Sequence, residues 1–245
     1  MSRLDQGYLR EMYVDPSRVD EPNAYPFDIP VIRKLGRLVL HPRMTFFVGE
    51  NGTGKSTLIE AIAINAGFNP EGGDKNLRFS VRGTESPLHG ALRLSRGARR
   101  EQDGFFLRAE SFYNVASALD DAGASRYGPR SLHAMSHGEA FLALVEHRFQ
   151  PNSLYILDEP ESALSPQRQF VLLAHMHRLA EHGRCQFVVA THSPILLGYP
   201  EGTIYELGDD GPHAVRYEDT AHVQLTRSFL QDRERFLSRL LGDSE

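Results

Sequence analysis

Residues 45–59 read TFFVGENGTGKSTLI, and this stretch decides the fold of the chain. It runs from β-branched and aromatic residues through a glycine-rich turn to the start of an apolar helix. The stretch fits the spacing G-x-x-x-x-G-K-[ST], in which backbone N–H groups surround phosphates, the lysine reaches the β- and γ-phosphates and the hydroxyl ligates Mg²⁺. The sequence therefore predicts a phosphate-binding loop formed by Gly49, Glu50, Asn51, Gly52, Thr53, Gly54, Lys55, Ser56 and Thr57.

The alternative is a glycine-rich turn that only caps a core helix. Lysine usage argues against it, because the chain has 24 Arg and 3 Lys, and yet position 55 is Lys. A compact ammonium group fits such a loop where a planar guanidinium would not. Gly52 and Gly54 let the backbone approach an anion closely, and the helix that begins near Lys55 adds the positive end of its dipole.

Length and composition predict one large domain. The chain has 245 residues, of which 40% are hydrophobic, enough for one sizeable core. We expect a loosely packed polar arm over residues 1–24 and a single domain over 25–245, with a helical lobe at about 111–150. The longest unbroken apolar run, residues 140–145, is too short for a membrane span, which needs about 20 residues.

The N-terminal residues and the single cysteine predict a cytoplasmic protein. The first residues, MSRLDQGYLREMY, lack the apolar core of a secretory signal. The single cysteine, Cys185, precedes an apolar run and is expected to be a small buried hydrophobe. A net charge of −5 and a pI near 6.1 argue against a globally basic nucleic-acid binder.

Strands and helices are expected to alternate after the phosphate loop, which favours a largely parallel α/β sheet with its site at the strand carboxyl ends. Before the loop, the pattern predicts two antiparallel strands around Leu35-Gly36. The expected strands are 30–33, 37–40, 105–108, 154–157 and 186–190, with hairpins around 92–94 and over 203–217. The expected helices are 58–66, 138–149, 166–182 and one or two within 225–241.

Carboxylates follow the apolar strand of LYILDEPESALSP, residues 154–166. Asp158 would reach the Mg²⁺ shell, and Glu159 could polarise the water that attacks a γ-phosphate. His192 follows the next strand, where its imidazole could bind a γ-phosphate oxygen. The alternatives are an acidic turn and a structural histidine, and the phosphate loop upstream favours the functional interpretation.

A helix start is predicted at MSHGEA, residues 135–140. Ser136 and Glu139 have the S-x-x-E spacing of a capping box. The same stretch, with Gly138, exposes backbone N–H groups that could bind a phosphate from a facing subunit. The two interpretations are compatible, because capping leaves other N–H groups free.

These motifs in order resemble an ATP-binding-cassette ATPase. VGENGTGKSTLIEAIA, GFNPEGG, FFLRAESF, SHGE, LDEPESALSP and ATHSP are similar to the small stand-alone ATPases labelled AAA-family or ABC-type, over roughly residues 25–241. The resemblance implies a P-loop NTPase with a mostly parallel sheet, helices on both faces, an antiparallel β subdomain and a short helical lobe. It also implies ATP as substrate, Mg²⁺ as cofactor and a nucleotide-sandwich homodimer, in which Ser136, His137, Gly138 and Glu139 form the trans signature.

The chain departs from the cassette pattern at three places. The signature usually reads Ser-Gly-Gly-Gln, so His137 and Glu139 change the trans contacts. Glu110 stands where cassettes carry Gln; it could ligate Mg²⁺ or lie on the surface. Ser165 replaces the usual Asp and suits a helix N-cap. Tyr25 or Phe27 could stack on adenine, with core packing as the alternative.

Three functions are consistent with the sequence. The first is an ATPase whose ATP-driven dimerisation acts on a cytosolic protein partner or nucleic acid. The second is the nucleotide-binding subunit of a membrane transporter, which we consider less consistent because Glu110 and Ser136 are only 26 positions apart. The third is an interaction module with little turnover, which intact Glu159 and His192 disfavour.

Overall fold

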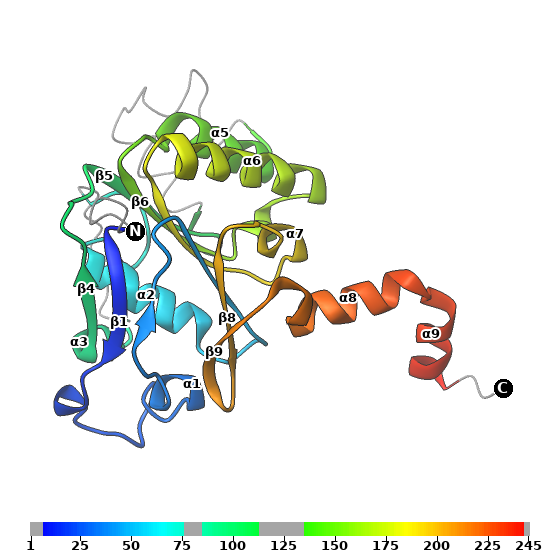
Figure 1. The fold of residues 1–245 in the computed structure, drawn as a ribbon, viewed down its shortest axis with the longest axis horizontal. Helices are drawn as coiled ribbons and strands as arrows, with labels where there is room; N and C mark the ends of the chain where they lie inside the picture. The colour runs from blue at the N-terminus through cyan, green and yellow to red at the C-terminus, as the bar shows by residue number, and fades with distance from the viewer. Residues whose placement is uncertain (1–6, 76–84, 113–134, 243–245) are drawn as a thin grey trace.

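A six-stranded sheet forms the centre of the described part of the chain. The computed structural model describes residues 7–75, 85–112 and 135–242 (Figure 1). Within these residues the strand order is β5-β6-β7-β3-β8-β9, and only β9 runs antiparallel to its neighbour. The strands are β3 (Met44–Val48), β5 (Asp103–Arg108), β6 (Ser153–Asp158), β7 (Gln186–Ala190), β8 (Thr203–Gly208) and β9 (Gly211–Val215).

Both faces of this sheet are covered, so its central strands read as continuous apolar runs. Every residue of β3, β6 and β7 is buried. Side chains alternate between two cores: Phe46 packs on one face and Phe47 on the other. This burial fixes the register of the strands and so fixes where their carboxyl ends lie.

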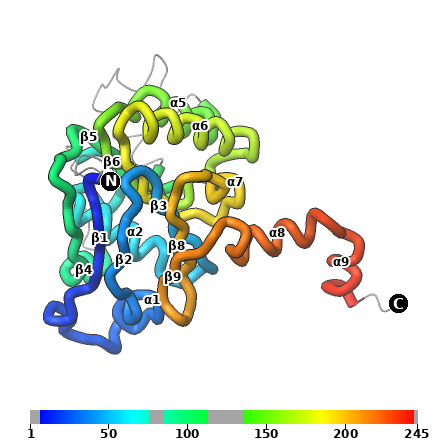
Figure 2. Tube along the Cα trace, viewed as in Figure 1, coloured from blue at the N-terminus to red at the C-terminus, as the bar shows by residue number. Residues whose placement is uncertain are grey.

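Helices cover the two faces (Figure 2). One core is closed by α5 (His137–Arg148), α6 (Pro166–His182) and α7 (Pro194–Leu197). The other is closed by α1 (Pro30–Arg33) and α2 (Lys55–Ala66). A three-stranded antiparallel sheet, in the order β2-β1-β4, packs on this second core. It comprises β1 (Leu9–Val14), β2 (Leu38–Val39) and β4 (Leu92–Arg96), with α3 (Leu88–Ala91) leading into β4.

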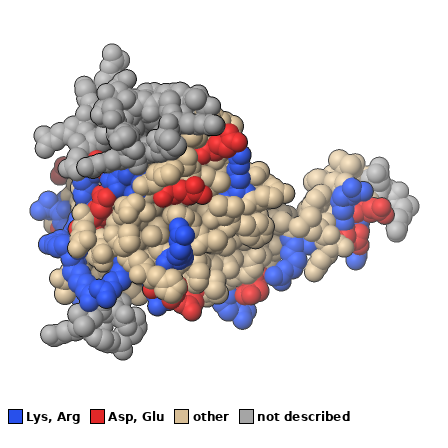
Figure 3. Space-filling view, turned by 90° about the horizontal axis from the view of Figure 1, so that it is seen from above, with Lys and Arg blue, Asp and Glu red and all other residues tan. Residues whose placement is uncertain are grey.

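Two C-terminal helices extend from this body (Figure 1). They are α8 (Ala221–Gln231) and α9 (Arg233–Leu241), and the short 3₁₀ turns are η2 (Pro16–Arg18), η5 (Pro160–Ala163) and η6 (Tyr217–Asp219). Among the described residues of α8, only Val223 is buried. None of the described residues of α9 is buried. The projecting part carries mixed charges over a largely uncharged surface (Figure 3). Leu225, Leu230, Leu240 and Leu241 are exposed on it.

The predicted fold class is confirmed: the structure is an α/β P-loop fold with a mostly parallel sheet and a separate antiparallel sheet. The expected helix 166–182 and strand 186–190 have the observed bounds. Gly67 ends α2 in the left-handed conformation, with φ 97°. Residues 203–217 contain the expected hairpin, formed by β8 and β9. No helix in the described residues is long and apolar enough to cross a membrane.

The prediction of two strands before the phosphate loop is wrong. Pro30–Arg33 is a helical turn, because Pro30 occupies its first position, where a missing N–H costs nothing and the fixed φ suits a helix. Leu38–Val39 is a strand, but its partner is β1. Likewise, β4 pairs with β1 and forms no local hairpin at 92–94.

The expectation of a loosely packed N-terminal arm is wrong for Leu9–Val14. These residues form the central strand of the antiparallel sheet, and Leu9 and Met12 are fully buried. The two buried positions of this strand are three apart, so no alternation marked the strand in the sequence. The division of the chain at residue 25 stays a prediction, and residues 113–134 of the predicted helical lobe lie outside the described part.

Candidate functional site

The predicted phosphate loop connects β3 to α2. Gly52 and Gly54 have φ values of 82° and 94°, a region that side chains with a Cβ rarely adopt. Gly49 lies so close to β8 that a Cβ would come within 2.5 Å of the Leu207 carbonyl oxygen. The Thr53 hydroxyl donates to the Glu50 carbonyl at 2.9 Å and closes the turn. The glycines therefore allow both the turn and its packing.

Lys55 lies beneath the loop with only 4% of its surface exposed. Its Nζ donates to the carbonyl oxygens of Gly49 at 2.8 Å and Glu50 at 3.0 Å. Burial lowers the pKa of Lys55, while the carboxylates of Glu159 and Asp158 act in the opposite direction. An ammonium group that donates to backbone carbonyls in this way can instead bind an anion in the loop.

Asp158 meets the phosphate loop at the carboxyl end of β6. The Ser56 hydroxyl donates to Asp158 Oδ1 at 3.2 Å, and Arg108 Nε lies 3.7 Å from Asp158 Oδ2. Burial raises the pKa of Asp158 to about 6, although Arg108 favours the charged form. A hydroxyl and a carboxylate at this distance are the hard oxygen ligands that Mg²⁺ prefers. The two residues therefore fit the predicted metal site.

Glu159 follows in the left-handed conformation, with φ 50° and ψ 51°. Its N–H donates to the Ala190 carbonyl at 2.9 Å, so the ends of β6 and β7 are tied together. This brings Glu159 Oε1 to 3.3 Å from His192 Nε2. A non-glycine residue in this conformation is strained, and such strain is concentrated at functional sites.

Lys55, Ser56 and Glu159 line an open pocket of about 430 Å³ beside the phosphate loop. Glu110 lines it, but its side chain is 90% exposed and lies 3.8 Å from Arg108 Nη2, so its role as a Mg²⁺ ligand stays a prediction. Tyr25 also lines this pocket, and its hydroxyl lies 3.1 Å from Thr57 Oγ1.

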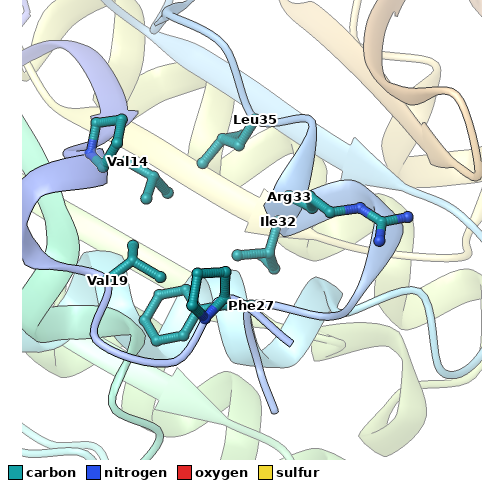
Figure 4. Close-up of a pocket in the computed structure, with 8 residues that line it drawn as sticks. Val14, Val19, Phe27, Ile32, Arg33 and Leu35 are labelled. Carbon is teal, nitrogen blue, oxygen red and sulfur yellow. The ribbon is translucent and has the colours of Figure 1, made fainter. Parts of the chain in front are cut away.

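Phe27 belongs to a different pocket, of about 220 Å³. It packs there near Val19 and Ile32 (Figure 4). Of the two aromatic residues proposed for adenine, Tyr25 is therefore the one at the phosphate loop. Its contact with adenine stays a prediction.

The predicted signature stretch begins α5, and its capping interaction is present. Glu139 Oε2 accepts from the Ser136 N–H at 3.0 Å and from the Ser136 hydroxyl at 2.7 Å. Gly138 packs against η5, where a Cβ would lie 2.8 Å from the Ala163 carbonyl oxygen. The phosphate-loop pocket of the same chain is lined by none of the four residues of this stretch, Ser136, His137, Gly138 and Glu139.

Two site residues were missed by sequence reasoning. Glu161 accepts the His192 N–H at 2.5 Å, and burial raises the pKa of this carboxyl group. His222, on α8, places Nε2 at 3.0 Å from His192 Nδ1. Each is about 30 positions from His192, and no local spacing relates them to it.

Comparison with known proteins finds similarity to a family model and to two ATP-binding proteins. A family model described as "AAA domain, putative AbiEii toxin, Type IV TA system" matches residues 93–198. The thiamine import ATP-binding protein ThiQ of Vibrio cholerae is 31% identical, over 59% of this chain and 66% of that protein, just under two thirds of its length. ThiQ of Photobacterium profundum is 23% identical, over 79% of this chain and 83% of that protein.

Among solved structures, the SMC head domain from Thermotoga maritima aligns with a TM-score of 0.48 and 17% identity, over 85% of this chain and 98% of that one. CbiO1 from Clostridium perfringens, part of the ABC transporter complex cbiONQ, aligns with a TM-score of 0.47 and 14% identity, over 85% and 91%. The phosphate loop, its contact with the acidic end of β6 and these relatives make the chain similar to the P-loop ATPases of the ATP-binding-cassette type.

Proposed function

We propose that the chain binds Mg-ATP, hydrolyses it with Glu159 as general base, and dimerises head to tail when ATP is bound. One observation carries the proposal. The 3.2 Å contact between Ser56 Oγ and Asp158 Oδ1 joins the phosphate loop to the acidic strand end, the two parts that such a site requires.

Each residue then has a defined task. The loop N–H groups and Lys55 bind the phosphates, and Ser56 and Asp158 hold the metal. Bound Mg²⁺ supplies positive charge that offsets the charge developing on the phosphates. Glu159 takes a proton from the attacking water, and His192 donates a hydrogen bond to a γ-phosphate oxygen. Tyr25 stacks on the adenine.

The decisive variant is Glu159→Gln, which keeps the shape of the side chain and removes its basicity. We expect ATP binding to be retained and hydrolysis to slow by about 10²–10⁴-fold, the usual contribution of a general base. Single-turnover phosphate release measures the chemical step, and equilibrium binding of a fluorescent ATP analogue measures affinity. Glu146→Gln, an exposed change on α5, is the matched control. Turnover at the wild-type rate in Glu159→Gln would place the base elsewhere.

We further propose that the dimer acts on a cytosolic protein or a nucleic acid. The Glu159→Gln protein should hold its partner in the ATP-bound state. Affinity capture from native cytosol, with ATP and with ADP, followed by nuclease treatment of one half of each sample, separates the two classes. Recovery of the same molecules with ADP would argue against a partner selected by the ATP state.

A second candidate is the ATP-binding subunit of a membrane importer. It is favoured by the relatives, which are named thiamine import ATP-binding proteins. The short interval between Glu110 and Ser136 disfavoured this function in the sequence, and the comparisons give that argument no support. Cell fractionation tests it: co-flotation of the chain with membranes, lost in high salt or with detergent, would favour the importer.

A further inference from the structure

His192 and His222 form a pair beside Glu159, a residue that lines the phosphate-loop pocket. His192 Nδ1 lies 3.0 Å from His222 Nε2, and the ring centroids are 5.0 Å apart. The second nitrogen of His192, Nε2, lies 3.3 Å from Glu159 Oε1. One imidazole therefore faces a carboxylate with one nitrogen and another imidazole with the other.

The protonation of His192 follows from these neighbours. Burial, together with the positive charge of Lys55, lowers the pKa of His192, so the ring is neutral at neutral pH and carries one N–H. Ionised Glu159 and a γ-phosphate oxygen only accept hydrogen bonds, so both favour the proton on His192 Nε2. His192 Nδ1 is then an acceptor, and the contact at 3.0 Å requires a donor on His222.

We propose that His222 is a positioning residue: its Nε2–H donates to His192 Nδ1 and holds His192 in the Nε2–H tautomer that can bind a γ-phosphate oxygen. The proposal rests on the proposed function, in which His192 faces that oxygen. In the opposite arrangement His192 Nδ1–H would donate to His222, and a lone pair on His192 Nε2 would face the Glu159 carboxylate.

The start of α8, residues 220–223, fixes His222 in place. The Ala221 N–H donates to Glu206 Oε1 at 3.0 Å, which joins the start of the helix to β8. Thr220 is fully buried and its hydroxyl donates to the Tyr217 carbonyl at 2.8 Å. Val223, the next residue along, is also buried. His222 is thus held by the one part of α8 that packs against the body.

The first test measures the tautomer directly in nucleotide-free protein. Long-range ¹H–¹⁵N NMR of the imidazole rings distinguishes a protonated nitrogen from an acceptor, and His192→Gln identifies the His192 signals among the 11 histidines. We expect His192 to be Nε2–H in the wild type and to become a mixture of tautomers in His222→Leu. A wild-type His192 protonated on Nδ1, or an unchanged His192 tautomer in His222→Leu, would overturn the proposal.

The second test compares two substitutions by steady-state ATPase kinetics. His222→Leu fills similar space without a donor, whereas the amide of His222→Gln can donate from near the position of Nε2. We expect His222→Leu to lower kcat by about 10- to 100-fold with KM changed less than threefold, and His222→Gln to stay within about threefold of wild type. Gln224→Leu, an exposed change on the same helix, controls for the added apolar side chain.

Equal loss of kcat in His222→Leu and His222→Gln would overturn the donor role and indicate packing alone.

Failure of the proposed function would give a different result. If Glu159→Gln hydrolysed ATP at the wild-type rate, the assignment of the general base would be wrong, but the His192 tautomer in nucleotide-free protein would still test His222.

Discussion

Lys55 illustrates how much at this site depends on single residues. Its ammonium group is buried and, within the described part of the chain, donates to the Gly49 and Glu50 carbonyls. Lys55→Ala should weaken ATP binding by about 100-fold or more, because a charge-assisted contact to the phosphates is lost. Isothermal titration with ATP measures this, and Lys34→Ala, an exposed change, is the control. The fold should persist, so unchanged affinity in a folded variant would contradict the phosphate-loop assignment.

Glu161 predicts a pH dependence of stability at the residue scale. Burial raises its pKa above the ordinary 4.5, so the folded protein binds a proton at this group more tightly than the unfolded chain does. The cost of ionising Glu161 is therefore absent below about pH 4.5 and grows as pH rises through the folded-state pKa. Glu161→Gln removes this cost and keeps an oxygen that can accept the His192 N–H.

The free energy of unfolding of Glu161→Gln should therefore rise relative to wild type between pH 5 and pH 8. Urea unfolding at the two pH values measures the difference. If the difference in free energy of unfolding between wild type and Glu161→Gln were the same at both pH values, Glu161 would not titrate in this range.

At the scale of elements, Arg148 fastens α5 to the central sheet. Its Nη1 lies 2.5 Å from Asp103 Oδ2, its Nη2 donates to Asp103 Oδ1 at 2.9 Å, and Nη2 also lies 3.2 Å from Asp74 Oδ2. Asp103 is on β5, and the guanidinium also lies over the Phe105 ring at 5.6 Å from its centroid. Because α5 begins at the signature stretch, this cluster fixes the helix that carries it.

Arg148→Met should lower the free energy of unfolding by about 2 kcal/mol. Loss of a buried partner typically costs about 3–5 kcal/mol, and the partial exposure of Asp103 reduces that cost. Urea denaturation measures the change, with exposed His147→Ala as control. ATP affinity should be unaffected, because the cluster contributes no group to the phosphate-loop pocket. A change within 0.5 kcal/mol would assign the attachment of α5 to apolar packing alone.

At the scale of the whole molecule, the signature stretch predicts assembly. Ser136 is at the exposed start of α5 and does not line the phosphate-loop pocket of its own chain, so the proposed function places it at the γ-phosphate of a second copy. A twofold dimer pairs Lys55 of each chain with Ser136 of the other. We expect Glu159→Gln to be monomeric without nucleotide or with ADP, and dimeric in Mg-ATP.

Light scattering measures this assembly, and Ser136→Arg added to Glu159→Gln supplies the matched comparison. The arginine side chain should block closure while ATP binding within each chain is retained. If the double variant dimerised as well as its parent, the signature role of residues 136–139 would be wrong, and capping of α5 would account for Ser136 and Glu139.

The sequence by itself determined the parts of this protein that depend on short-range spacing. The phosphate loop, the acidic end of β6 and the start of α5 each lie within one continuous segment, where glycine conformations, helix capping and apolar runs act locally. Alternation of strands and helices was then enough to place Lys55, Asp158 and His192 at the carboxyl ends of the strands of a parallel sheet.

Only the tertiary structure decided the contacts between distant segments. Leu9–Val14 became a strand because β2 and β4 satisfy its backbone and because Leu9 and Met12 are buried in the same core as α2, neither of which is visible in its own residues. Glu161 and His222 meet His192 because η5, the end of β7 and the start of α8 come together in space. Such contacts depend on which elements pack as neighbours, and that choice is made by burial over the whole chain.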